Sequence, residues 1–273
     1  MKINFVKEVL KSGGHVIGSE VSRLPSSEVP NIYAAAGLDF VFIDMEHTPF
    51  NLETVAALIR AARQEQIVPI VRVPQAEYAF VCRVLDAGAQ GIIVPRVNTP
   101  QTVRELVSWM RYPPHGIRGF ACTAAQTDGQ AVGLETFMKA ANEETLLVIQ
   151  IERVEAMSHL DEMLSIEGVD VACLGYMDLT IDMGYPGQID HPDVVAAVDR
   201  IIETANANGV APGIISPEMN VLEHWVSRGM RFISYATDAI LLQTAAISSE
   251  QQLRSICRQT NLAPSQNMAS ATN

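Results

Sequence analysis

The chain has 273 residues, of which 48% are hydrophobic and 18% are charged, so its length and composition suit one α/β barrel with a large core. Its 31 acidic and 19 basic side chains give a net charge of −12. This balance argues against nucleic acid and anionic membranes as partners, because both bind through clustered Lys and Arg.

Short apolar runs bounded by Gly, Pro or charged residues predict eight buried strands, at residues 15–19, 40–44, 67–72, 91–95, 146–152, 169–174, 211–215 and 231–235. Amphipathic patterns predict helices among them, at residues 52–64, 76–87, 100–110, 154–165, 192–208, 217–228 and 238–258. This alternation favours a (β/α)8 TIM barrel over its competitor, a doubly wound open sheet. The open sheet usually has fewer strands and a Gly-rich first turn, which this sequence lacks.

Two segments fall outside the alternation. Residues 111–145 form a long insertion between the fourth and fifth strands, with a helix near residues 134–141, and such insertions are often lids or binding loops. Residues 262–273 are small and polar, so we expect a disordered tail after a single barrel domain at residues 1–261, which closes with an extended C-terminal helix.

The N-terminal segment has an amphipathic helical pattern without an apolar signal core, and no stretch approaches membrane-spanning length. The four cysteines are widely spaced and fit neither a zinc motif nor a secreted disulfide framework. We therefore expect a soluble protein in the reducing cytoplasm.

Polar side chains stand at the carboxyl ends of several predicted strands, where chemistry takes place in barrels of this type. Because these strand ends meet at one mouth, residues distant in the sequence would converge on one site. They are Asp44, Glu46 and His47 at the second strand, Arg72 at the third, Gln150 and Glu152 at the fifth, and Asp178 after the sixth.

Glu152 and Asp178 are the best candidates for metal ligands, because each follows a strongly apolar strand and the two strands are adjacent. Two carboxylates with open positions suit a hard divalent ion such as Mg²⁺ or Mn²⁺. Alternatively, Glu152 forms an ion pair with Arg153 or Arg72.

Arg72 and His47 each have two readings. Arg72 either neutralises Glu46 or stabilises a developing negative oxygen beside a metal, and both roles can hold together. His47 is either an ordinary residue after a strand or the imidazole of a dyad with Asp44, which would suit proton transfer near neutral pH.

The lysines supply negative information about the chemistry. The four lysines are Lys2, Lys7, Lys11 and Lys139, and none lies at the end of a predicted strand. A Schiff-base mechanism needs a buried amine, so the sequence disfavours one. Carbon–carbon chemistry here would therefore need a metal to withdraw electrons.

Several ordered motifs carry a resemblance that covers about residues 4–250. They are AGLDFVFIDMEHTPF (36–50), VPIVRVP (68–74), LDAGAQGIIVPRVNT (85–99), RYPPHGIRG (111–119), VIQIE (148–152), EGVDVACLGYMDLTIDMGYPGQIDHPDV (167–194) and APGI (211–214). With them the chain resembles the HpcH/HpaI aldolases, which are metal-dependent pyruvate aldolases. The resemblance implies a (β/α)8 barrel in homo-oligomers, trimers or hexamers, commonly with an exchanged C-terminal helix.

The resemblance also implies a class II aldolase that makes or cleaves a 2-oxo-4-hydroxy acid from a pyruvate-like 2-oxo acid and an aldehyde. Glu152 and Asp178 would hold the divalent metal ion, Mg²⁺ or Mn²⁺ first and Co²⁺ or Zn²⁺ as further options. Arg72 would hold the pyruvyl oxygen as it becomes an enolate. Asp44 and His47 would activate a metal-bound water that moves the proton of the aldol hydroxyl.

Further positions follow from the same resemblance. Asp86 would approach the site of a neighbouring subunit, and Gln150 would belong to the pyruvate pocket. The backbone from Gly175 to Met177 and Asp178 would receive the pyruvate carboxylate.

The chain also departs from the family pattern. Tyr176 replaces a usual proline, and residues 121–129 lack an arginine that grips the far end of some acidic substrates. We therefore do not expect a long dicarboxylate such as the heptanedioate as the substrate. We expect a substrate whose aldehyde portion is different or less polar. The alternative functions are a related metal-enolate condensation, citrate-synthase-like or decarboxylative, and a non-catalytic binding protein on the same barrel.

Overall fold

Eight parallel strands close into a barrel in which each strand pairs with its neighbours along the chain. The computed structural model describes residues 2–260. The strands are β1 (Val16–Val21), β2 (Phe40–Asp44), β3 (Val68–Arg72), β4 (Gly91–Val94), β5 (Leu146–Ile151), β6 (Val171–Leu174), β7 (Ala211–Ser216) and β8 (Phe232–Thr237). The predicted (β/α)8 barrel is confirmed, and the expected tail at residues 262–273 lies outside the described residues.

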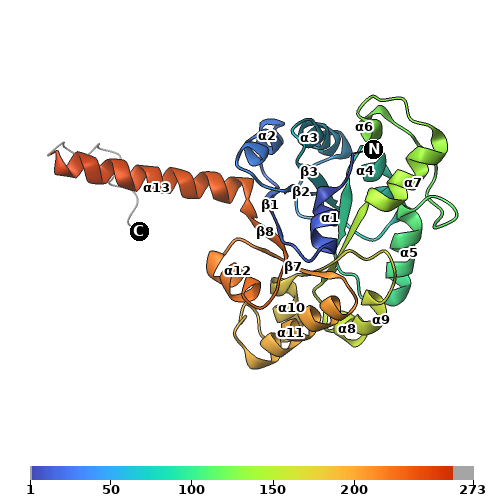
Figure 1. Cartoon of the computed structure of the whole chain (residues 1–273). Coiled ribbons are helices and arrows are strands. Elements are labelled where there is room, and N and C mark those ends of the chain that lie inside the picture. Colours follow the sequence, from blue (N-terminus) through green and yellow to red (C-terminus); the bar gives the residue numbers. More distant parts are fainter. Residues whose placement is uncertain (1, 261–273) are drawn as a thin grey trace.

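Helices surround the barrel, and α13 projects away from it (Figure 1). They are α1 (Phe5–Lys11), α2 (Glu28–Ala35), α3 (Leu52–Gln64), α4 (Tyr78–Asp86), α5 (Pro100–Met110), α6 (Ala124–Thr127), α7 (Leu134–Glu144), α8 (Val154–Ser158), α9 (Leu160–Leu164), α10 (Tyr176–Asp182), α11 (Pro192–Ala207), α12 (Met219–Val226) and α13 (Asp238–Gln259). Within residues 2–260, no helix is both long and apolar enough to cross a membrane.

Several details differ from the sequence-based expectations. The first strand continues beyond Ser19 to Val21, and α2, α6 and α10 were not predicted. The helix expected at residues 154–165 is broken at His159, whose N–H donates to the oxygen of Ala156, three residues back, at 3.1 Å. The α2 helix accommodates Pro30 because this proline lies in the first turn, where an N–H has no partner within the helix.

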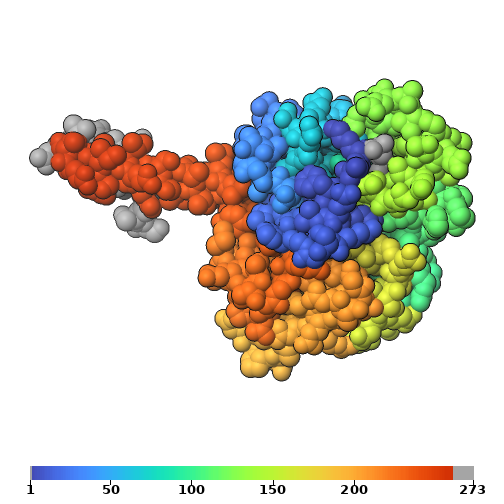
Figure 2. Space-filling model, viewed as in Figure 1, coloured from blue at the N-terminus to red at the C-terminus, as the bar shows by residue number. Residues whose placement is uncertain are grey.

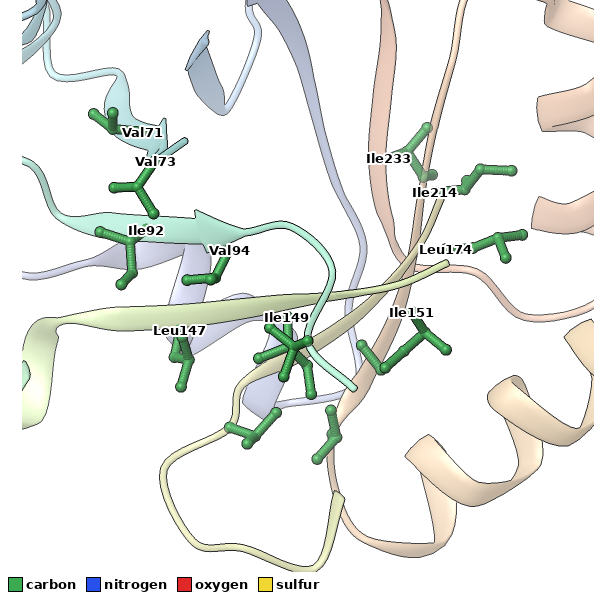
Figure 3. Packing of buried hydrophobic residues seen from close by; sticks show 14 of the residues in the cluster. Val71, Val73, Ile92, Val94, Leu147, Ile149, Ile151, Leu174, Ile214 and Ile233 are labelled. Atoms are coloured by element: carbon green, nitrogen blue, oxygen red, sulfur yellow. The ribbon is translucent and has the colours of Figure 1, made fainter. Parts of the chain in front are cut away.

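The side chains of each strand alternate between the barrel interior and the surrounding helices. In β5, Leu147, Ile149 and Ile151 belong to the apolar layer between strands and helices, part of which is drawn in Figure 3. Val148 belongs to a second cluster, inside the barrel. The same alternation makes Gln150 the next inward position, so the column of interior side chains becomes polar near the carboxyl end of the strand.

The α1 helix covers the amino-terminal end of the barrel. Val6 and Leu10 of α1 pack into the interior cluster together with Phe40 and Phe232, whose rings stack at 4.4 Å. In Figure 1 this helix lies across the strands. The interior is thus filled with apolar side chains at this end, and the polar interior positions lie at the opposite mouth.

Candidate active site

A buried ion pair occupies the carboxyl ends of β2 and β3. The parallel register aligns Asp44 with Arg72, and the guanidinium Nε of Arg72 donates to Oδ1 of Asp44 at 2.7 Å. The Asp44 carboxylate also accepts the backbone N–H groups of Glu46 at 3.0 Å and His47 at 3.2 Å. Burial by itself would raise the pKa of Asp44, but the hydrogen bond and charge of Arg72 outweigh it, so the pKa lies below its usual value.

Arg72 is held by further contacts. Its Nε lies 3.3 Å from Oε2 of Glu46, its Nη1 donates to Oε1 of Gln150 at 3.5 Å, and its guanidinium stands 5.0 Å from the centre of the Phe42 ring. Burial by itself would lower the pKa of Arg72, but Asp44 and other nearby carboxylates raise it. Arg72 is therefore a permanently charged donor in a fixed position.

Glu152 follows β5 directly and is only 5% exposed. Its Oε1 accepts the backbone N–H of Arg96 at 2.6 Å, and its Oε2 accepts Nε2 of Gln150 at 3.3 Å. A Cβ atom at Gly175 would lie 2.3 Å from the same Oε2. Glycine at this position therefore leaves the space that the Glu152 carboxylate occupies.

The surroundings of Glu152 carry excess negative charge. Burial, together with the charges of Asp178 and Glu46, raises the pKa of Glu152 to about 7, against the lowering effects of the Arg96 N–H and Arg72. Asp178 lies in the first turn of α10 and is exposed.

The carboxylates of Glu152 and Asp178 are suitable ligands for a divalent cation. Hard divalent ions prefer carboxylate oxygens, and the missing Cβ of Gly175 leaves room for the Glu152 carboxylate. Among residues 2–260, no group of three or more His, Cys, Asp or Glu side chains gathers in a metal-binding arrangement. Glu152 and Asp178 would therefore leave other positions to water or substrate oxygens.

The structure corrects the expected geometry of His47. Its Nε2 lies 3.6 Å from Oε2 of Glu46, and the side chain is 65% exposed. Asp44 contacts the backbone N–H of His47 and not its ring. The direct carboxylate–imidazole dyad is therefore not the observed arrangement, because the turn after β2 uses the Asp44 carboxylate to hold its own backbone.

Asp86 and Met177, which the sequence also predicted as site residues, lie in two separate parts of the molecule. Asp86 ends α4 and accepts Nη2 of Arg118 at 2.9 Å and Nε2 of Gln126 at 3.4 Å. Because α4 leads back to the start of β4, Asp86 lies toward the amino-terminal end and is not brought together with Asp44 within one chain. Its expected role at a neighbouring subunit stays a prediction. Met177 is exposed in the first turn of α10, two residues after Gly175.

The structure adds Arg96 to the site. This residue has a left-handed backbone conformation with φ of 52°, its Nη1 lies 2.6 Å from Oε1 of Glu46, and its backbone N–H holds Glu152. Arg96 thus joins the loops after β2, β4 and β5. From the sequence, Arg96 could have been noticed as a basic residue that follows a buried strand and Pro95. Its partners could not have been predicted from the sequence.

Glu20 is a second addition. Val16, Gly18 and Glu20 occupy alternate positions of β1, so Glu20 continues the inward column toward the mouth. Burial raises its pKa to about 7, against the lowering effect of Arg72, and the charge of Asp44 adds to the rise. Sequence reasoning missed Glu20 because it ended the strand at Ser19.

The closed barrel and the charged groups at its carboxyl-terminal mouth define a (β/α)8 protein with the attributes of an enzyme. The family of HpcH/HpaI aldolases and citrate lyases matches residues 24–245. The chain belongs to this family, and its similarity to named aldolases supports assignment as a carbon–carbon lyase.

Named relatives of the chain are aldolases. The chain is 35% identical over 243 residues to the 4-hydroxy-2-oxo-heptane-1,7-dioate aldolase of Shigella sonnei strain Ss046, covering 89% of this chain and 92% of the relative. It is 33% identical over 245 residues to the hydroxypyruvate/pyruvate aldolase of Sagittula stellata, covering 90% of this chain and 96% of the relative.

Solved structures agree with this placement. The HpcH/HpaI aldolase from Desulfitobacterium hafniense DCB-2 superposes with a TM-score of 0.85 at 31% identity, covering 91% of this chain and 96% of the other. The citrate synthase SbnG superposes with a TM-score of 0.79 at 33% identity, covering 92% and 98%.

Proposed function

We propose that the chain is a divalent-metal-dependent aldolase, which makes or cleaves a 2-oxo-4-hydroxy acid from a pyruvate-like 2-oxo acid and an aldehyde. The observation that carries this proposal is the buried, permanently charged Arg72, which Gln150 links through hydrogen bonds to the buried carboxylate of Glu152. The similarity to aldolases that are named for pyruvate and hydroxypyruvate supports the choice of substrates.

Glu152 and Asp178 would hold the metal ion, for which Mg²⁺ and Mn²⁺ are the first candidates and Co²⁺ and Zn²⁺ are further ones. The close approach of Gly175 to the Glu152 carboxylate and the local excess of negative charge support this assignment. Such an ion supplies positive charge that polarises the carbonyl group of a 2-oxo acid.

Arg72 stabilises the oxygen that becomes negative when the carbon–carbon bond breaks. Its Nε is committed to Asp44 at 2.7 Å, whereas its Nη1 makes only a long hydrogen bond of 3.5 Å to Gln150. The Nη groups can therefore donate to a substrate oxygen. Gln150 donates its amide to Glu152 and orients the carboxylate at the floor of the pyruvate pocket.

His47 moves the proton of the aldol hydroxyl, with solvent as its exchange partner. Its side chain is open to solvent and lies 3.6 Å from Glu46. Asp44 acts as a positioning residue, because its carboxylate holds the backbone N–H groups of residues 46 and 47. The backbone from Gly175 to Met177 would receive the carboxylate of the 2-oxo acid.

The aldehyde portion is proposed to be less polar than a chain that ends in a second carboxylate. Residues 121–129 contain no arginine to pair with such a group. We expect faster turnover of neutral aldols than of 4-hydroxy-2-oxo-heptane-1,7-dioate. Equal kcat/KM values for the two kinds of substrate would contradict this preference.

The proposed activity is tested by an aldol-addition screen. Pyruvate or hydroxypyruvate is incubated with aldehydes of varied length and polarity, with and without a chelator, and the products are identified by mass spectrometry. We expect product only with metal, and restored activity when Mg²⁺ or Mn²⁺ is added back. Full activity in metal-free protein would overturn the proposal.

A related condensation on a metal-stabilised enolate is the second candidate function. Similarity to the citrate synthase SbnG favours it over unrelated chemistries. Assays that combine oxaloacetate with acyl thioesters distinguish it from aldol chemistry. Only a condensing enzyme would join the two substrates into a larger carboxylic acid, whereas an aldolase needs an aldehyde as the second substrate.

We also propose a cytoplasmic homo-oligomer, a trimer or hexamer. Asp238 is the buried residue of α13, and the helix exposes Leu242, Ile247, Leu253 and Ile256. This helix would gain burial against another copy of the chain. The free Cys82, Cys122, Cys173 and Cys257 are compatible with a reducing compartment. Light scattering coupled to size exclusion tests the assembly, and a monomer at working concentration would contradict it.

A further inference from the structure

A cavity of about 1090 Å³ lies at the amino-terminal end of the barrel, opposite the candidate active site. It is lined by α1, by the end of α5 and the residues that follow it, by α7 of the insertion, and by the segments that lead into β6 and β7. Figure 2 views the molecule from the side on which α1 and the insertion lie. Its volume is slightly larger than the range of about 300–1,000 Å³ that is typical of small-molecule sites.

Basic and acidic side chains are equal in number among the residues that line this cavity, although the chain as a whole is acidic. Lys7, Lys11 and Lys139 line it, which are three of the four lysines of the chain, and Arg111 joins them. Acidic residues that also line the cavity and are exposed are Glu135, Glu143 and Glu167. The buried charges at the floor therefore decide what the cavity can bind.

The floor holds two buried cations and one carboxylate. Lys7 Nζ donates to the backbone oxygen of Thr145 at 2.8 Å and lies 3.2 Å from Oδ1 of Asp170. Arg111 Nη2 donates to the same Thr145 oxygen at 3.2 Å. The other oxygen of Asp170 accepts the backbone N–H of Leu147 at 2.9 Å. Asp170 thus compensates one positive charge of the two.

Arg111 is the unsatisfied group. It is 7% exposed, and its buried Nη1 has no hydrogen-bond partner among the described residues. Burial lowers the pKa of Arg111 and lowers that of Lys7 to about 8, although Asp170 opposes both changes. A buried donor without a partner is costly, and a guanidinium is well suited to the two oxygens of a carboxylate or phosphate.

We propose that this cavity is a second ligand site, which binds a small organic anion through a carboxylate or phosphate head group on Arg111 and Lys7. The remaining wall is partly apolar and suits a short carbon skeleton, since it includes Leu10, Val107, Met138, Leu164, Ile166 and Val169. This site is separate from the mouth that holds Arg72 and Glu152, so it stands independently of the proposed aldolase activity.

Isothermal titration calorimetry on the full metal-loaded protein tests the site. Three probes separate the two head groups from the carbon skeleton: inorganic phosphate, hexyl phosphate and hexanoate. We expect one saturable site per chain for at least one probe, with affinity reduced at least about tenfold in Arg111→Gln and in Lys7→Met. A greater affinity for hexyl phosphate than for inorganic phosphate would support the apolar wall.

Two control variants locate the binding. Arg104→Gln removes a guanidinium from the exposed side of α5, where Arg104 pairs with Glu162, and should leave anion affinity unchanged. Arg72→Ala removes the guanidinium of the mouth and should also leave it unchanged. Anion binding that is lost in Arg72→Ala but kept in Arg111→Gln would assign the ligand to the mouth and overturn the proposal.

The proposal remains testable if the Arg111 variant does not fold. Met138 lines the cavity from α7 and is partly buried, so Met138→Trp should fill space and weaken binding at least about tenfold without removing a charge. Undiminished affinity in folded Met138→Trp would refute the site. Absence of saturation by all three probes up to about 10 mM in the unaltered chain would refute it as well.

Discussion

The two ends of the barrel each bury an arginine, but in opposite electrostatic settings. Arg72 at the mouth is 8% exposed and lies beside Asp44 and Glu46, and its pKa is raised. Arg111 at the amino-terminal end is 7% exposed, has an unsatisfied Nη1, and its pKa is lowered. Because their burial is nearly equal, the neighbouring groups decide whether the guanidinium is stabilised.

The comparison separates two uses of a buried cation. Arg72 is held by protein carboxylates, so it is fixed in position before any substrate arrives. Asp170 pairs directly with Lys7 and acts on Arg111 only through its charge, so an external anion would complete the surroundings of Arg111. An arginine whose charge is already paired with protein carboxylates suits a preorganised catalytic group. An arginine that lacks a partner suits a ligand site.

The largest effect is expected from removing the groups of the mouth. Arg72→Ala and Glu152→Ala should each lower kcat/KM for the aldol substrate by about 10³-fold or more, because each removes charge stabilisation from the transition state. Circular dichroism should show a folded barrel in both. Arg104→Ala is the matched control, since Arg104 pairs with Glu162 on the surface. Full activity in either mouth variant would contradict the assigned roles.

The two arginines should also differ in their contribution to stability. Arg72→Met leaves the buried Asp44 carboxylate without its cation, whereas Glu46 keeps Arg96, and it should cost about 3–5 kcal/mol of unfolding free energy. Arg111→Met removes a cation with an unmade hydrogen bond, while Lys7 still holds the Thr145 oxygen, so its cost should stay below about 1 kcal/mol. Urea denaturation measures both, and equal losses would remove the distinction.

A third prediction concerns the space beside Glu152. The added Cβ of Gly175→Ala would lie 2.3 Å from Oε2 of Glu152 and should displace the carboxylate. We expect the affinity for Mn²⁺ to fall by about 10–100-fold, measured by titration calorimetry. Gly133→Ala serves as the control, because its backbone φ is −65° and the nearest atom to its new Cβ lies 4.0 Å away. Unchanged affinity in Gly175→Ala would argue against Glu152 as a ligand.

The smallest effect is a pH dependence from Glu20. Its pKa of about 7 in the folded chain is above its ordinary value, so its contribution to stability is full below about pH 4 and is lost as the pH rises through 7. Glu20→Gln stays neutral. The unfolding free energy of the variant should therefore gain about 1–3 kcal/mol relative to the unaltered chain between pH 5 and pH 8.

Urea denaturation at a series of pH values checks this prediction. A stability difference between the two proteins that does not change with pH would show that the Glu20 carboxyl group is not held protonated by the mouth.

Local signals explain which elements could be predicted from the sequence. The bounds of α3 and α5 agree with the prediction because their caps are local, with Asn51 Oδ1 accepting from the Thr54 N–H and Thr99 Oγ1 from the Thr102 N–H. The α10 helix was missed because its seven residues follow β6 through Gly175 without a side-chain cap. Short elements of this kind depend on their tertiary surroundings.

By itself, the sequence determined the barrel and the end at which its polar residues gather, because strand and helix periodicities are local and the carboxyl ends of parallel strands meet on one side. Only the tertiary structure decided the partners. Asp44 holds backbone N–H groups where an imidazole was expected, and Arg96 joins Glu46 to Glu152. The unsatisfied Arg111 is also visible only there, since the pairing of buried charges depends on distances that no sequence pattern encodes.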